Sequence, residues 1–412
     1  MYSIAADNHN QITESKPARI ARWAVLAAFP ISLTSPGATV AMAITALCGL
    51  WLWKQVKRLP GDIVAGGKVA AAAYVLLVVV DLGNGGDAAA NLLQTGVNYL
   101  PVLALAPLAF AIRLSGVTAG QIDRSLQLTI LIAPAISIFG FATGEPRPGG
   151  VNLNPIPYGF AILLSSSLLL WRGLEVGVRG VLSVALALLA LLPILLTGSK
   201  IVWACAIAAY SIASAHWIIS NRKWAAVIPV VLVAASGAAI AYHAFAKSRL
   251  EYLWLELQEF ADNGISMGGS FGRRAEMAIG GWNAFLERPI LGYGLDERMA
   301  AVFAHARPGG PDLTIHNHMH NDYVTHLVAY GISGGIFLAV YFGLLLWLAA
   351  NAKPASYKWF GYTLAVMLAI YMTAEVAFNM DPVSGPMAVF LALLLASRTG
   401  LGSRPDPTAT QQ

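Results

Sequence analysis

The stretch that decides how this chain is interpreted is His316-Asn317-His318-Met319-His320-Asn321-Asp322-Tyr323. Three of the 8 histidines of the chain stand here at alternate positions, beside an amide and a carboxylate. The residues that follow, up to position 350, are apolar enough to form a membrane span. A polar cluster at the mouth of a transmembrane helix is costly to hold near lipid, which makes it a candidate functional site. We expect the other helices to build a cavity around it.

The composition is that of a polytopic membrane protein. Hydrophobic residues make up 57% of the chain, charged residues 11%, and the mean hydropathy is +0.64. The net charge of +5 would suit nucleic acid, but the basic residues fall in short clusters between apolar runs. Membrane lipid is therefore expected as a partner and nucleic acid is not. Cys48 and Cys205 lie in separate apolar runs and are predicted to be unpaired buried residues.

The apolar runs predict an all-α fold with about 12 transmembrane helices. The expected spans are residues 20–32, 37–53, 69–82, 99–112, 126–142, 155–171, 181–197, 201–220, 224–245, 320–350, 359–380 and 386–397. Residues 1–19 and 398–412 are expected to be cytoplasmic tails. Residues 20–245 then hold the first nine spans and residues 320–397 the last three, with one large hydrophilic insertion, residues 246–319, between them.

The placement of lysine and arginine predicts the orientation. With the amino terminus inside, every inner segment holds basic residues, whereas the outer hairpin loops at residues 34–36, 81–98 and 381–385 hold none. Basic residues that lie outside oppose this bias and are candidates for a function: Arg147, Lys200, Lys247, Arg249, Arg273, Arg274, Arg288, Arg298 and Arg307. Long outer loops cross the membrane regardless of charge, so Arg147 and Lys200, in short outer turns, are the stronger candidates.

The insertion has helical patterns of its own. Apolar residues recur at helical spacing over residues 250–260, which predicts an amphipathic helix that lies on the membrane surface or caps the bundle. A second helix is expected over residues 274–287, ending before Pro289. On this helix Arg274 faces the protein or the membrane, where a guanidinium needs an anionic partner.

Three interpretations compete for the histidine cluster. A metal site is suggested by His318-Met319-His320-Asn321-Asp322, although Tyr323 stands where a further ligand histidine would follow the aspartate. General base catalysis by one histidine is the second, because an imidazole titrates near neutrality and can take a hydroxyl proton. The third is a set of solvated histidines beside a helix cap, which suits His305 and His316, while His326 is expected inside the bundle.

The chain resembles the bacterial O-antigen ligases and the related O-antigen polymerases. His320-Asn321, nine further residues and Gly331-Ile332-Ser333-Gly334 fit their shared signature, with Phe337 where the ligase pattern has a third glycine. Arg274 stands 15 residues before Pro289-Ile290-Leu291-Gly292-Tyr293-Gly294, which is similar to a second block of the family. Thr197-Gly198-Ser199-Lys200 resembles the family's G-S-R turn, with lysine replacing arginine, and Asn154-Pro155 after Arg147 resembles its early outer loop.

The resemblance implies a multi-pass glycosyltransferase of the bacterial inner membrane, with its active site on the periplasmic side. It implies transfer of a glycan from undecaprenyl diphosphate to a lipid A–core hydroxyl, without metal or other cofactor. His320 would be the general base, with Asn321, Asp322 and His318 beside it. Arg274, Lys200 and Arg147 would hold the diphosphate, and Glu375 would either pair with an outer arginine or orient His320. A polymerase of the same superfamily and a lipid or polysaccharide transporter are the alternatives.

Overall fold

The computed structural model describes residue 13, residues 15–56, 60–84, 88–151, 153–221, 247–263, 269–378 and 381–398, and residue 401. The predicted span at residues 224–245 lies outside these residues. The described chain is all-helical, as predicted, and its extended pairings are limited to isolated bridges between Thr34 and Val151 and between Gly150 and Leu153.

The elements follow one another in two series. Before the segment at residues 222–246 they are α2 (Lys16–Ile31), α3 (Gly37–Trp53), α4 (Gly61–Gly83), α5 (Ala88–Asn98), α6 (Leu100–Leu103), α7 (Leu105–Leu114), α8 (Ala119–Ala142), α9 (Pro155–Glu175), the 3₁₀ turn η1 (Gly177–Gly180), α10 (Val181–Leu189), α11 (Leu191–Leu196) and α12 (Lys200–Asn221). After it they are α14 (Lys247–Asn263), α15 (Ser270–Glu287), α16 (Gly294–Ala304), α17 (Asp322–Tyr330), α18 (Ile332–Asn351), α19 (Ala355–Tyr371) and α20 (Asp381–Ser397).

Several helices have the length and apolarity of membrane spans. Among the described residues, 5 helical segments qualify: Gly61–Gly83, Ala119–Ala142, Gly177–Leu196, Lys200–Ser220 and Ile332–Asn351. Shorter apolar helices, such as Gly37–Trp53 and Pro382–Ser397, accompany them. The chain is therefore a polytopic membrane protein, while the number of spans and the side on which residues 246–319 lie stay predictions.

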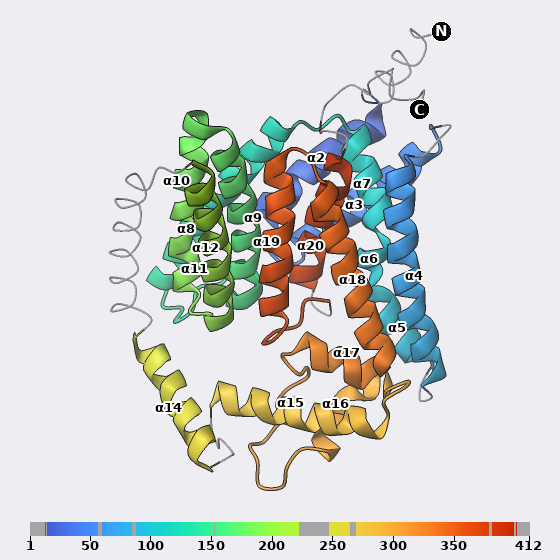
Figure 1. Cartoon of the computed structure of the whole chain (residues 1–412), viewed down its shortest axis with the longest axis vertical. Coiled ribbons are helices and arrows are strands. Elements are labelled where there is room, and N and C mark those ends of the chain that lie inside the picture. Colours follow the sequence, from blue (N-terminus) through green and yellow to red (C-terminus); the bar gives the residue numbers. More distant parts are fainter. Residues whose placement is uncertain are drawn as a thin grey trace.

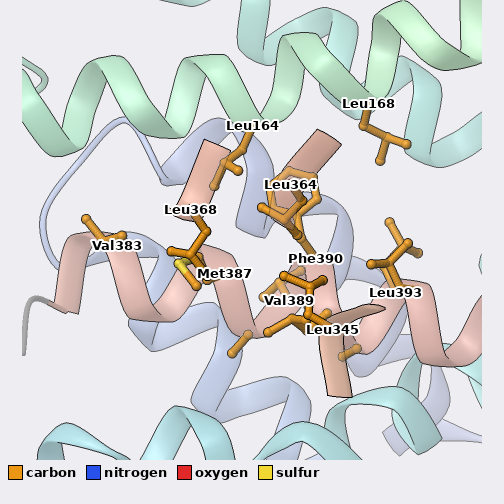
Figure 2. Close-up of a cluster of buried hydrophobic side chains, with 14 of the residues drawn as sticks. Leu164, Leu168, Leu345, Leu364, Leu368, Val383, Met387, Val389, Phe390 and Leu393 are labelled. Atoms are coloured by element: carbon orange, nitrogen blue, oxygen red, sulfur yellow. The ribbon is translucent and has the colours of Figure 1, made fainter. Parts of the chain in front are cut away.

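The bundle is built around α20. Figure 2 shows Val383, Met387, Phe390 and Leu393 of this helix surrounded by leucines of neighbouring helices, Leu164 and Leu168 of α9, Leu345 of α18, and Leu364 and Leu368 of α19. Every residue from 383 to 397 is buried, so this helix has no lipid-facing side over that stretch. Cys48 and Cys205 are both buried and unpaired, as predicted.

Four predicted elements are interrupted where hydrophobicity shows no break. The run at residues 99–112 is divided between α6 and α7, and the run at 181–197 between α10 and α11. In both, a proline four residues further on, Pro107 or Pro193, has no N–H to donate to the last residue of the first helix. The run at 320–350 is divided into α17 and α18, and the run at 359–380 ends at Tyr371. In addition, the predicted loop at 81–98 contains α5.

A second layer lies across one end of the bundle. In Figure 1, α15 runs beneath the ends of the bundle helices, close to α16 and α17, and α14 lies at its side. A small apolar core formed by Met277, Ala284, Val302, Met319 and Val328 joins α15, α16, α17 and the segment before α17. The helices predicted at 250–260 and 274–287 are both present, within α14 and α15.

Candidate active site

Two glycine-containing blocks fix the position of α17. Gly331 has φ +59 and ends the helix, and a Cβ placed there would lie 2.4 Å from Ile290 O. Ile332 N donates to Pro289 O at 2.7 Å, and Tyr293 N donates to Val328 O at 2.9 Å. The two blocks therefore serve close packing of α17 against the chain that leads into α16.

The start of α17 is fixed by Asn321. Its side-chain oxygen accepts from Val324 N at 3.1 Å, which caps the helix, and its Nδ2 donates to Thr373 O at 3.2 Å. His320, immediately before the cap, has φ +50, a conformation that non-glycine residues rarely adopt. This turn directs the His320 ring toward the segment that follows α19.

That segment, residues 372–378, is anchored by Asp322. The Asp322 N–H donates to Met372 O at 2.9 Å, and its fully buried carboxylate accepts from the N–H groups of Ala377 and Phe378. Behind it, His326 Nδ1 lies 2.7 Å from Asp322 O, and His326 Nε2 lies 2.9 Å from the Tyr99 hydroxyl. Asp322 is therefore a positioning residue, and His326 is buried inside the bundle as predicted.

The imidazole of His320 lies against the carboxylate of Glu375. His320 Nδ1 is 3.1 Å from both Oε1 and Oε2. Because an ionised carboxylate only accepts hydrogen bonds, we assign the Nδ1 proton to this contact, which leaves Nε2 as the basic nitrogen. The side chain of His320 is 17% exposed and that of Glu375 is 2% exposed. A partly exposed imidazole is thus hydrogen-bonded to a buried carboxylate.

Arg274 completes the same group. Its NH2 donates to Glu375 Oε1 at 2.9 Å, and its side chain is 32% exposed. Both contacts considered for Glu375 from the sequence, with an arginine and with His320, are therefore present. Glu375 lies in the non-helical segment after α19, whereas the sequence analysis placed it within the span itself.

His318 and His316 surround the His320 ring. Their ring centroids lie 4.0 Å and 5.5 Å from that of His320. Burial lowers the pKa of His318 to about 4, and the positive charges of nearby groups add to the effect. Burial likewise lowers the pKa of His316. Both rings are therefore neutral at physiological pH, so neither contributes positive charge for a phosphate.

The donor set is also one that a metal could use. His318, His320 and Glu375 each offer a ligand atom, and these atoms lie within 4.8 Å of one another. Two imidazoles and a carboxylate suit zinc or iron. The guanidinium of Arg274 on the same carboxylate opposes a second cation there. These contacts thus favour the general base interpretation of His320 over the metal site.

Arg147 and Lys200 lie on other elements. Arg147 Nε donates to Thr197 O at 2.9 Å, at the turn that precedes α12. Gly198 in this turn has φ +60, and Lys200 is the first residue of α12, which packs against α9 and α19. Arg147 is thereby joined to the turn that leads into Lys200, whereas Arg274 is joined to Glu375, which also contacts His320.

One residue of the region was not distinguished by the sequence analysis. Arg298 of α16 is only partly exposed, and its NH2 lies 3.5 Å from the carbonyl oxygen of Asn317, next to His318. In the sequence it was one of several arginines in the insertion. Only the docking of α16 against α17 reveals that its side chain faces the histidine cluster.

Comparison with known proteins matches part of the chain to a family. Residues 185–339 match the family model described as O-antigen ligase. This confirms the resemblance to the O-antigen ligase and polymerase superfamily, and the matched residues include His320, Arg274 and Lys200. No curated protein matches the chain.

Proposed function

We propose that this protein, a polytopic membrane protein with an O-antigen ligase domain, transfers a glycan from undecaprenyl diphosphate to a lipid A–core hydroxyl. The reaction would take place at the periplasmic face of the bacterial inner membrane. The observation that carries the proposal is the pairing of His320 Nδ1 with the buried carboxylate of Glu375, 3.1 Å away. This pairing leaves Nε2 as the proton acceptor in a partly exposed ring.

In the proposed step, the acceptor oxygen attacks the anomeric carbon of the donor sugar. The hydroxyl proton passes to His320 Nε2, and the new imidazolium is stabilised by Glu375. The bond between the anomeric carbon and the phosphate oxygen breaks, and its electron pair remains on the diphosphate. Arg274 would offset the leaving-group charge with the guanidinium N–H groups that do not donate to Glu375.

Lys200 and Arg147 form the second part of the proposed donor site. Lys200 ends the turn at residues 197–200, and Arg147 is bonded to the same turn. A lysine and an arginine there would supply the further positive charge that a diphosphate needs. Asn321 and Asp322 contribute by holding the segment that carries Glu375.

The test of the catalytic assignment is transfer from lipid-linked glycan to purified lipid A–core by the protein in detergent. His320→Ala is expected to lower the rate about 10³-fold, within the range of general base catalysis. His316→Ala, a matched change in the same segment, is expected to leave the rate within a few-fold of the native protein. Native activity in His320→Ala would overturn the base assignment, and loss of native activity on adding a chelator would favour the metal.

A deletion strain tests the choice between ligase and polymerase. Loss of a ligase should leave bare lipid A–core on a gel while polymeric glycan accumulates on the carrier lipid. Core that bears single repeat units would instead identify the protein as a polymerase of the same superfamily.

A further inference from the structure

We propose that Arg298 is a phosphate-binding residue for the lipid-linked donor, adjacent to the His318–His320 segment. This inference rests on the proposed transferase function and adds to it a residue that the motifs do not contain. Its basis is that, within the described residues, the Arg298 guanidinium makes no ion pair, whereas those of Arg274 and Arg307 do. All three lie in the layer formed by α15, α16 and the segment before α17.

Two other arginines of this layer have carboxylate partners. Arg274 pairs with Glu375 and Arg307 pairs with Glu276, and both carboxylates are almost fully buried. Within the described residues, Arg298 makes no ion pair: its NH1 donates to Leu295 O and its NH2 to Asn317 O at 3.5 Å. Its Nε is buried and has no hydrogen-bond partner there. In the described structure, the hydrogen bonds of the Arg298 guanidinium thus go to neutral carbonyl groups alone.

Such a cation is costly unless an anion accompanies it. Removing a guanidinium from water without a counter-charge raises its free energy. The effect is visible in the pKa of Arg298, which burial lowers despite nearby Tyr330, Tyr99 and acidic groups. A phosphate would supply both the counter-charge and acceptors for a planar fork of N–H groups. The side chain remains partly exposed, so an anion can reach it.

The place of Arg298 connects this anion to the catalytic group. Its hydrogen bond to Asn317 lies one residue from His318, whose pKa the Arg298 charge helps to lower. The His318 ring in turn lies 4.0 Å from that of His320. A phosphate on Arg298 would therefore be near the base, where the leaving group of the transfer must be.

The alternative role is structural, since the bond to Asn317 also ties down the segment before α17. Arg298→Gln can still donate a hydrogen bond but has no charge. Arg298→Lys keeps the charge but lacks the planar set of guanidinium N–H donors. Arg288→Gln is a matched control, because Arg288 is exposed, lies in the same layer and stacks over the Tyr293 ring at 4.5 Å.

The experiment measures binding of geranylgeranyl diphosphate and of geranylgeraniol to the full-length protein in detergent, by native mass spectrometry. Arg298→Gln is expected to weaken diphosphate binding about 10- to 100-fold, the loss typical of a hydrogen bond to a charged group. Binding of the alcohol should be unchanged. Arg298→Lys should lose only a few-fold, and Arg288→Gln should match the native protein.

Two results would overturn the proposal. One is native diphosphate affinity in Arg298→Gln, and the other is an equal loss for diphosphate and alcohol, which a structural role predicts. His320→Ala separates this proposal from the catalytic one, because it should bind the diphosphate with native affinity although its rate of glycan transfer falls about 10³-fold. A native protein that does not prefer the diphosphate over the alcohol would contradict both proposals.

Discussion

Two clusters of charged side chains lie at opposite ends of α19, and they differ in how fully their polar groups are used. The Arg172 cluster consists of Asp123, Arg172, Glu175 and Ser356, near the start of the helix. The His320 cluster consists of Arg274, His318, His320 and Glu375, just beyond its end.

In the Arg172 cluster, the charged groups are hydrogen-bonded to one another. Arg172 donates to both oxygens of Asp123 at 3.0 Å and to Glu175 at 3.1 Å, and its guanidinium lies over the Tyr357 ring. Glu175 accepts in addition from the Ser356 hydroxyl at 2.5 Å. These groups join α8, α9 and α19, so the cluster stabilises the packing of the bundle.

In the His320 cluster, by contrast, some polar side-chain atoms have no hydrogen-bond partner in the described structure. Glu375 is satisfied by His320 and Arg274, yet the Nε2 of the partly exposed His320 ring has no assigned partner and His318 Nε2 is buried without one in the described structure. An arrangement that leaves acceptor nitrogens unused next to a fixed carboxylate suits a transferred proton better than a structural contact. The two clusters thus differ as a structural cluster and the proposed catalytic one should differ.

The largest difference is expected when the two glutamates are changed in the same way. Glu375→Gln should lower the transfer rate about 10²-fold, because an amide cannot stabilise the imidazolium as a carboxylate does. Glu175→Gln should leave the rate of the folded protein near native and lower its melting temperature. Transfer assays and thermal unfolding in detergent provide both values, and equal rate losses in the two variants would remove the distinction.

A smaller effect, on stability alone, is expected at Arg172. The Arg172 side chain is 11% exposed, so Arg172→Ala leaves Asp123 and Glu175 without their main partner. Breaking such a pair typically costs about 3 kcal/mol. Reversible unfolding in denaturant should show this loss, whereas the donor affinity of the remaining folded protein should not change. A native unfolding midpoint would show that the cluster is dispensable for packing.

The smallest effect is a pH dependence from His318. Because the folded protein holds the pKa of this ring at about 4, below its usual 6.5, the unfolded chain takes up a proton first as the pH falls. The contribution to stability is complete above pH 6.5 and is lost as the pH falls toward 4. His318→Gln should therefore show a shallower fall in melting temperature between pH 7 and pH 4.5. Parallel curves of melting temperature against pH for the native protein and His318→Gln would contradict the low pKa of His318.

The sequence predicts His320 and its neighbours because their signal is local. Asn321 caps α17 from its own position, and the spacing from His320 to Gly331 follows the chain. Arg274 is predicted in a helix for the same reason.

The remaining geometry depends on distant contacts. Residues 359–380 are continuous in hydropathy, yet the helix ends at Tyr371, where Asp322 binds the backbone of residues 372, 377 and 378. The direction of Arg298 depends on how α16 docks, which periodicity within one short helix does not determine. Contacts between residues about 50 positions apart in sequence, such as His320 with Glu375, thus lie beyond local patterns.

The central claim, that His320 acts through a free imidazole nitrogen, is tested most directly by chemical rescue. The rate of glycan transfer by His320→Ala is measured with the protein in detergent while free imidazole is added, with 2-methylimidazole as a bulkier analogue. If His320 is the base, the variant should have a very low rate that rises with imidazole concentration toward a plateau, and rises less with the bulkier base. A rate in His320→Ala that equals the native rate without any added imidazole would contradict it.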